Sequence, residues 1–287
     1  GTMIPPSIVL IIYGLTTETS ITMLFQEAIV PGLLISGLII TYILVRTRLQ
    51  PHLAPISDEP GLTLKEKLKY LPGFLAPITI VIIVLGSIYS GITGITEAAG
   101  MGVVATMFLI WMRKEFTWFL FKDALTRTFK ATGTIITITF GATVLAGAYS
   151  LAGGPTYVAE LILGYDLQPM WIIFMMMLIF LVLGMFMDWV GIVLLIMPVF
   201  LPIVLKLGFD PIWFGILFCV NMQVSFLSPP FGPAAFYLKS VAPPHISLID
   251  IFRGFGPFIC LQLIVLACVM FFPELTQNFH EFIPRKW

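Results

Sequence analysis

The chain has 287 residues, of which 59% are hydrophobic and only 10% charged, and its mean hydropathy is +1.02. A soluble domain carries about 25% charged residues. This composition therefore excludes an ordinary soluble protein and indicates a polytopic membrane protein in a lipid bilayer. The formal net charge is zero, which offers no long-range attraction to nucleic acid.

The chain begins at Gly1, inside an apolar segment, without an initiator methionine or a signal peptide. We interpret it as the C-terminal portion of a longer protein. Its cysteines, Cys219, Cys260 and Cys268, lie in apolar runs, and neither they nor the three histidines have metal-ligand spacing. The pattern predicts buried thiols, no metal site and no cofactor.

Long apolar runs predict five whole membrane spans. They cover residues 29–45, 73–90, 96–112, 131–152 and 254–272. Shorter amphipathic pieces beside them fit helices that lie in the membrane interface. These cover residues 21–28, 63–71, 116–130 and 246–253. Residues 49–62, rich in proline and acidic side chains, are predicted to form a loop.

Two further segments interrupt their apolar sequence. Residues 170–205 are two apolar runs separated by Asp188, which fit either a hairpin or two crossings. Residues 211–240 predict a helix broken at residues 228–232 (SPPFG), because prolines remove backbone donors and glycine adds a hinge. In hydrocarbon, broken backbone survives only where it is buried in protein or lines a wet cavity. Transporters use such breaks to hold ions.

A matching break occurs near the start of the chain, at Ile4-Pro5-Pro6-Ser7. In both places the proline pair is followed by a tyrosine, a polar patch, an amphipathic octamer and a span that begins with proline and glycine. Basic residues crowd loops 46–70 and 113–130 and are absent from 153–168, so the first two are predicted to be cytoplasmic. An even number of crossings separates the two breaks, which predicts inverted repeats, as in secondary transporters.

A series of motifs resembles the large permease subunit of tripartite ATP-independent periplasmic (TRAP) transporters, which is DctM-like. The motifs are residues 1–7 (GTMIPPS), Leu24-Phe25, Pro31-Gly32, Thr96-Glu97-Ala98-Ala99 with Gly102, residues 184–188 (GMFMD) with Pro198 and Pro202, Phe214-Gly215, Asn221, and residues 228–232. The resemblance covers essentially the whole chain. It implies a bacterial inner-membrane transporter that imports small organic acids such as dicarboxylates, with sodium as coupling ion. It also implies two partners, a small membrane subunit (DctQ-like) and a periplasmic substrate-binding protein.

The resemblance further implies an all-α, inverted-repeat, elevator-type transporter with a re-entrant hairpin, Pro-Pro broken helices and interfacial arm helices. Residues 1–48 would end the first repeat, 49–72 would form a cytoplasmic loop and arm helix, and 73–287 would form the second repeat. Within the second repeat lie scaffold spans 73–152, hairpin 170–205, broken helix 211–240 and last span 254–272. The family's first hairpin would precede Gly1.

Sodium needs several hard oxygen ligands, as hard cations do. The candidates are Gly184, Met185 and Asp188 at the hairpin tip, and Ser225, Ser228, Pro229 and Gly232 at the break. Each has a simpler interpretation. Asp188 fits a cap on the following helix as well as an ion ligand. The serines fit a proline kink in which each hydroxyl bonds its own helix.

Residues of the substrate cavity are predicted around the same breaks. Near the break at residues 228–232 they are Asn221, Pro230 and Phe231. Near the break at the start of the chain they are Pro5, Pro6 and Ser7, and Gly1 and Thr2 are further oxygen donors there. Asn221 fits a cavity wall and a bond to a neighbouring helix equally well. Half-helix N-termini would meet the substrate carboxylate, since their dipoles favour anions.

Two rival functions follow from the same sequence. One is a stand-alone sodium- or proton-coupled carboxylate symporter of the related ion-transporter type, which needs no binding protein. The other is an intramembrane enzyme, which would need paired aspartates or a serine with a histidine. Asp188 is the only aspartate deep in apolar sequence and no histidine lies near it in the chain. The sequence therefore predicts that the protein is not an enzyme.

Overall fold

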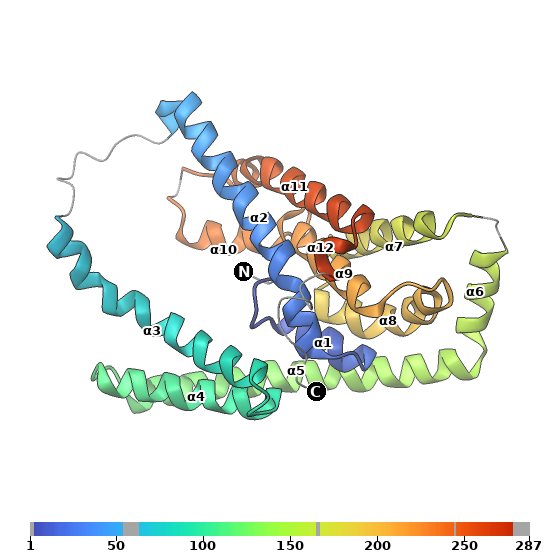
Figure 1. The fold of residues 1–287 in the computed structure, drawn as a ribbon, viewed down its shortest axis with the longest axis horizontal. Coiled ribbons are helices and arrows are strands. Elements are labelled where there is room, and N and C mark those ends of the chain that lie inside the picture. Colours follow the sequence, from blue (N-terminus) through green and yellow to red (C-terminus); the bar gives the residue numbers. More distant parts are fainter. Residues whose placement is uncertain (1–2, 54–62, 165–166, 244, 278–287) are drawn as a thin grey trace. The chain divides into compact units, whose positions relative to one another are not determined.

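The structure is a computed structural model that describes residues 3–53, 63–164, 167–243 and 245–277 (Figure 1). These residues form helices and connecting turns, and no strand occurs among them. The helices are α1 (Ile8–Thr17), α2 (Ile21–Leu49), the 3-10 helix η1 (Pro51–Leu53), α3 (Leu64–Tyr89), α4 (Ile95–Met112), α5 (Trp118–Leu151), α6 (Gly154–Leu163), α7 (Pro169–Gly184), α8 (Trp189–Lys206), α9 (Pro211–Leu227), α10 (Pro233–Val241), α11 (Leu248–Phe271) and α12 (Glu274–Gln277).

Five of these helices are long and apolar enough to cross a membrane, namely α2, α4, α5, α8 and α11. Predicted spans 29–45 and 96–112 fall within α2 and α4, and 131–152 and 254–272 lie in α5 and α11 except for one residue at their C-terminal ends. The fifth prediction, 73–90, falls on α3, whose apolar part Leu75–Tyr89 is shorter. An all-α polytopic membrane protein is therefore confirmed.

The chain divides into two compact units. The first consists of Gly1–Ile43 and Ile135–Trp287, and the second of Leu44–Thr134. The boundaries pass through α2 and α5. The predicted repeat boundaries are a different division of the chain, and they stay a prediction.

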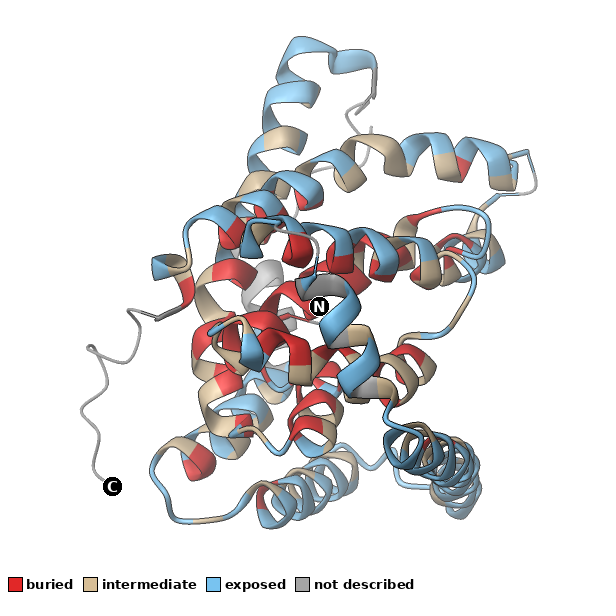
Figure 2. Ribbon diagram, turned by 90° about the vertical axis from the view of Figure 1, so that its right-hand side faces the viewer, coloured by how far each residue is buried: buried red, intermediate tan, exposed pale blue. Residues whose placement is uncertain are grey.

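The first unit is built around α9, which packs against α1, α7, α8, α10 and α11. Most of its residues are buried, including the large side chains of Trp213, Phe214 and Phe218. Phe180 of α7 completes an aromatic cluster, with ring centroids 5.0 Å from Phe218 and 6.0 Å from Phe214. In a bilayer, lipid is as apolar as these rings, so close packing rather than the hydrophobic effect holds such helices together. Figure 2 shows the buried residues gathered where several helices meet.

The second unit contains α3, α4 and the first half of α5. α3 and α4 pack against each other across the turn that follows Tyr89. Gly91 has φ +71° in this turn, a left-handed conformation that glycine adopts without steric cost. Most side chains described in α4 and the first half of α5 are exposed, as expected of helices whose outer faces meet lipid.

The prediction of four separate amphipathic helices is wrong, because each piece continues into the neighbouring span without a break. Residues 21–28 open α2, 63–71 lead into α3, 116–130 open α5, and 246–253 open α11. Pro31 and Pro257 lie inside α2 and α11. A single internal proline removes one helix hydrogen bond, and membrane helices tolerate that loss. The resulting helices run to 34 residues in α5.

Candidate functional site

The helix break predicted at residues 228–232 is present. α9 ends at Leu227, Ser228 is its C-cap, and α10 begins at Pro233. The Pro229–Pro230 peptide bond is cis. Gly232 has φ +33°, and a Cβ there would lie 2.6 Å from a ring carbon of Phe252 in α11. Only glycine fits this point, where backbone conformation and close packing both exclude a side chain.

The turn between α7 and α8 lies directly against this break. A Cβ on Gly184, the last residue of α7, would lie 2.3 Å from the Ser225 hydroxyl oxygen. The amide of Phe231 donates a 3.3 Å hydrogen bond to the carbonyl oxygen of Met185. The turn between α7 and α8 and the helix break therefore share a backbone hydrogen bond.

The serines bond to their own helix. Ser225 Oγ donates to the carbonyl oxygen of Asn221 at 3.2 Å, and Ser228 Oγ donates to that of Val224 at 2.8 Å. Both serines are buried. These bonds are the ones expected of a simple proline kink. A hydroxyl has one proton to donate and two lone pairs, so the lone pairs of each serine oxygen can still accept a bond or coordinate an ion. Back-bonding and ion coordination are therefore compatible.

Asp188 is exposed and caps α8. Its carboxylate accepts a 3.2 Å hydrogen bond from the amide of Val190, two residues into the helix. This is the capping interpretation of the residue. Capping satisfies one of the amides at the start of α8 and fixes the direction in which the chain leaves the hairpin turn.

Asn221 is fully buried on α9 and reaches the neighbouring helix α7. Its side-chain amide nitrogen donates a 2.6 Å hydrogen bond to the carbonyl oxygen of Met177. Its side-chain oxygen Oδ1 has no hydrogen-bond partner within the described part of the chain. Of the two interpretations left open by the sequence, the structure has the bond to a neighbouring helix.

The break near the start of the chain shares the cis proline pair but not the caps around it. Its Pro5–Pro6 bond is cis, and Ser7 caps α1 by accepting a 3.5 Å bond from the amide of Leu10. Pro5 and Ser7 are buried, whereas Pro6 is exposed. The contacts that join the hairpin turn to the second break do not include these residues. The predicted donors Gly1 and Thr2 lie outside the described residues.

A cavity of about 380 Å³ lies between the ends of α1, α8 and α9 and the middle of α11. It is lined by Ile8 and Val9 of α1, Trp189 of α8, Met222, Gln223, Phe226 and Leu227 of α9, and Gln262 of α11. It thus touches the first turns of α1 and α8 and the last turn of α9. Gln262 is buried, and its side-chain oxygen has no partner within the residues the structure describes. Nothing in the sequence singled out Gln223 or Gln262, because a glutamine in an apolar helix carries no local signal of its neighbours.

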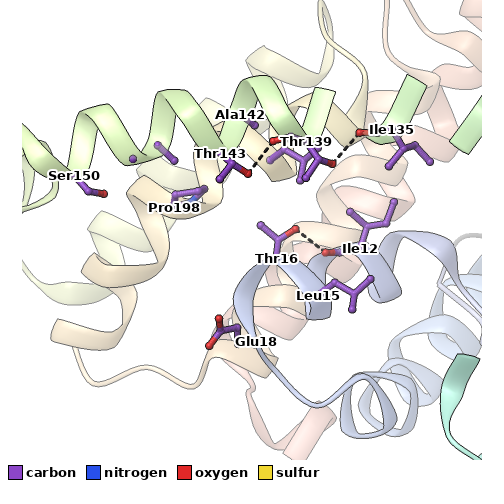
Figure 3. Close-up of a pocket in the computed structure, with 13 residues that line it drawn as sticks. Ile12, Leu15, Thr16, Glu18, Ile135, Thr139, Ala142, Thr143, Ser150 and Pro198 are labelled. Atoms are coloured by element: carbon purple, nitrogen blue, oxygen red, sulfur yellow. Dashed lines mark hydrogen bonds between the residues drawn. The ribbon is translucent and has the colours of Figure 1, made fainter. Parts of the chain in front are cut away.

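A larger cavity of about 600 Å³ lies between α1, α5 and α8 (Figure 3). Its threonine hydroxyls bond within their own helices, Thr16 to Ile12 and Thr139 to Ile135. The predicted site residues are not part of its lining. We assign no function to this cavity.

Comparison with known proteins decides the family. A model of the DctM component of tripartite ATP-independent periplasmic transporters matches residues 1–275. The chain belongs to this family. It is therefore part of a transport protein and not an enzyme, and the intramembrane-enzyme interpretation is wrong. With its five apolar helices, this DctM-family chain is a multi-pass protein of the bacterial inner membrane.

Several TRAP permeases are similar along nearly the whole chain. A putative large permease protein of Haemophilus influenzae is 30% identical over 99% of the chain and 68% of its own length. The C4-dicarboxylate large permease protein DctM of Pseudomonas aeruginosa is 31% identical over 96% of the chain and 64% of its own length. The isethionate permease protein DctMQ of Oleidesulfovibrio alaskensis is 29% identical over 97% of the chain and 43% of its own length. The chain thus spans between 43% and 68% of the length of these relatives.

Proposed function

We propose that the whole protein is the large permease subunit of a sodium-coupled TRAP transporter that imports small organic acids. Three of its relatives are named for C4-dicarboxylates, isethionate and sialic acid, which are organic anions, and another is named for ectoine. Because the chain spans only part of these relatives, the proposal concerns the complete subunit. A small membrane subunit and a periplasmic binding protein would be its partners, and the fused name of one relative, DctMQ, supports the first of them.

The sodium site is proposed where the hairpin turn meets the break. The observation that carries it is the hydrogen bond from Phe231 to Met185, together with the close approach of Gly184 to Ser225. Helix ends and interrupted backbone bring carbonyl oxygens into one place, and those oxygens suit a hard cation. The free lone pairs of Ser225 and Ser228 would add hydroxyl ligands. Asp188 would act mainly through its cap on α8.

The substrate anion is proposed to bind in the 380 Å³ cavity beside this site. The first turns of α1 and α8 line it, and helix N-termini favour anions through their dipoles and unpaired amides. The side-chain amides of Gln223 and Gln262 can donate to a carboxylate. Sodium would hold the hairpin turn against the break and so complete the wall of the cavity formed by Trp189.

Transport would follow an elevator movement. The hairpin α7–α8 and the broken helices α1 and α9–α10 would carry the substrate past a scaffold built from the other spans. α9 packs against α1, α7, α8 and α10, which would move with it, and also against α11, past which it would slide. The helices α1 and α7–α10 would then move as one body.

The test is uptake of organic acids into proteoliposomes that contain the complete large subunit, its small partner and its binding protein. We expect uptake to require a sodium gradient and to fall at least tenfold when Ser228→Ala is combined with Asp188→Ala. Ser240→Ala is the matched control, because this exposed serine also bonds its own helix, at Tyr237, but lies outside the site. Uptake that does not depend on sodium, or that is unchanged by the double substitution, would contradict the proposed sodium site. Uptake without the binding protein would favour a stand-alone symporter.

A further inference from the structure

The second compact unit contains an apolar cleft that the proposed transport function does not use. Its volume is about 560 Å³, within the range of about 300–1,000 Å³ found for small-ligand sites. One wall is a face of α4, with Ala99, Gly102, Val103, Thr106, Met107 and Ile110. The other is a face of α5 and the turn before it, with Phe116, Leu120, Phe121, Ala124, Leu125 and Thr128, and Ile80 of α3 completes the lining.

Large apolar side chains in this cleft remain uncovered by protein. Val103 is 60% exposed, and Phe116, Leu120 and Leu125 are each 42–43% exposed. The cleft is lined almost wholly by carbon atoms, so it suits a hydrocarbon chain better than a polar solute.

One end of the cleft is basic. Arg113 follows Ile110 by three residues and so continues the cleft face of α4 beyond the helix end. Its guanidinium extends toward α3, where a Cβ on Gly73 would lie 3.9 Å from Nη2. Lys114 is next in the turn and exposed, and Glu115 is the carboxylate that follows.

Exposed tryptophans indicate the depth of this basic end in the membrane. Trp111 is 67% exposed and Trp118 is 72% exposed, and they flank the turn that carries Arg113 and Lys114. Tryptophan is enriched at the level of lipid headgroups. The turn therefore lies at headgroup level, and the apolar cleft extends from it toward the acyl chains.

Charge is divided unevenly between the two units. Leu44–Thr134 carries ten Lys and Arg residues against six Asp and Glu residues, a net charge of +4 within a chain whose total is zero. Basic loops mark the cytoplasmic side, where anionic lipids are attracted to clustered lysine and arginine.

We propose that the cleft of α3, α4 and α5 binds an anionic phospholipid of the cytoplasmic leaflet. An acyl chain occupies the apolar cleft, and the phosphate is held by Arg113 and Lys114. A guanidinium is the side chain best suited to bind phosphate in a two-pronged manner. The lipid stabilises the second unit by filling space between helices that protein side chains leave uncovered.

The test is native mass spectrometry of the full-length permease in a non-ionic detergent with added phosphatidylglycerol or phosphatidylcholine. We expect phosphatidylglycerol to bind preferentially and Arg113→Gln with Lys114→Gln to weaken it about tenfold or more. The matched control is Lys122→Gln with Lys130→Gln, which removes the same charge from the part of α5 that faces away from the cleft. This control should bind as the unmodified protein does.

A second variant tests the acyl chain independently of charge. Ala124→Phe places a ring in the cleft and should weaken phosphatidylglycerol binding while leaving all basic residues in place. Equal binding of both lipids, or equal loss in the charge variant and its control, would overturn the proposal. If Ala124→Phe leaves lipid bound and instead prevents co-purification of the small subunit, the cleft is a subunit interface and the lipid proposal is wrong.

Discussion

The phenol hydroxyl of Tyr13 in α1 donates a 2.6 Å hydrogen bond to the carbonyl oxygen of Pro211, at the start of α9. The same ring lies over Gly215, where a Cβ would come within 2.4 Å of it. Tyr13 is fully buried and stacks on Phe218, with ring centroids 6.2 Å apart. The helix that follows the first proline pair is thereby fixed to the helix that precedes the second, across 198 residues of sequence.

This contact between α1 and α9 predicts that two substitutions lower the stability by different amounts. Gly215→Ala places a methyl group in the space that the Tyr13 ring occupies. We expect it to lower the free energy of unfolding by about 1–3 kcal/mol, as overpacking does. Tyr13→Phe removes one partly buried hydrogen bond and should cost about 1 kcal/mol. Thermal unfolding in detergent measures both. Gly37→Ala is the control, because nothing lies within 4 Å of a Cβ there, and it should be neutral or slightly stabilising.

The contact between Gly184 and Ser225 predicts that a substitution at Ser225 reverses the effect of one at Gly184. Gly184→Ala should push the hairpin turn away from the break, which lengthens the bond from Phe231 to Met185. Deuterium uptake by peptides that contain Phe231 should therefore rise. Because the Ser225 side chain is the obstacle, adding Ser225→Gly should restore protection. Gly191→Ala, which meets only Met187 at 3.6 Å, should leave exchange unchanged, and a rise there equal to that of Gly184→Ala would contradict the contact.

Asp188 allows capping to be separated from ion binding. Asparagine is as good a helix cap as aspartate, whereas alanine is about 1 kcal/mol worse. If Asp188 acts through its cap on α8, Asp188→Asn should keep both thermal stability and sodium-dependent uptake, and Asp188→Ala should lose part of each. Equal loss of sodium affinity in both variants, measured from the sodium dependence of uptake, would instead make the carboxylate charge itself a ligand.

The break between α9 and α10 was predictable from sequence because its causes are local. Prolines at 229, 230 and 233 remove donors, and Gly232 adopts a positive φ, whatever packs around them. The continuity of α2, α3, α5 and α11 is not predictable in this way, because a change from amphipathic to apolar sequence resembles a helix boundary. Composition changes there with depth in the membrane, while the backbone hydrogen bonds continue.

The pairings between helices were not predictable from one sequence. Asn221 bonds Met177, Tyr13 bonds Pro211, and the indole of Trp213 donates to the Val269 carbonyl oxygen at 2.9 Å. Each joins residues more than 40 positions apart, and backbone carbonyls give no sequence signal of their partners. Glu27 illustrates the same limit. It belongs to a piece predicted to lie in the membrane interface, yet it is only 1% exposed in the structure.

Asn221 predicts opposite effects for two substitutions of similar size. Asn221→Asp replaces the donor to Met177 with a carboxylate oxygen 2.6 Å from a carbonyl oxygen. Burial of an unpaired charge is costly, so we expect loss of several kcal/mol or failure to fold. Asn221→Leu removes both the hydrogen bond and the side-chain oxygen, which has no partner among the described residues. It should change thermal stability by about 1 kcal/mol or less. Similar destabilisation by both variants would show that the hydrogen bond itself dominates.

The last prediction concerns Gln262 at the wall of the proposed substrate cavity. Gln262→Glu keeps the side-chain shape but replaces an amide donor with a negative charge, which repels an organic anion. In reconstituted uptake, KM for the substrate should rise about tenfold or more, with a smaller change in maximal rate, because the loss falls on binding. Gln168→Glu introduces the same charge at an exposed position outside this cavity and should leave KM unchanged. If Gln262→Glu lowers the maximal rate and leaves KM unaltered, the substrate does not bind beside Gln262, and the cavity serves the movement of α11 against α9 instead.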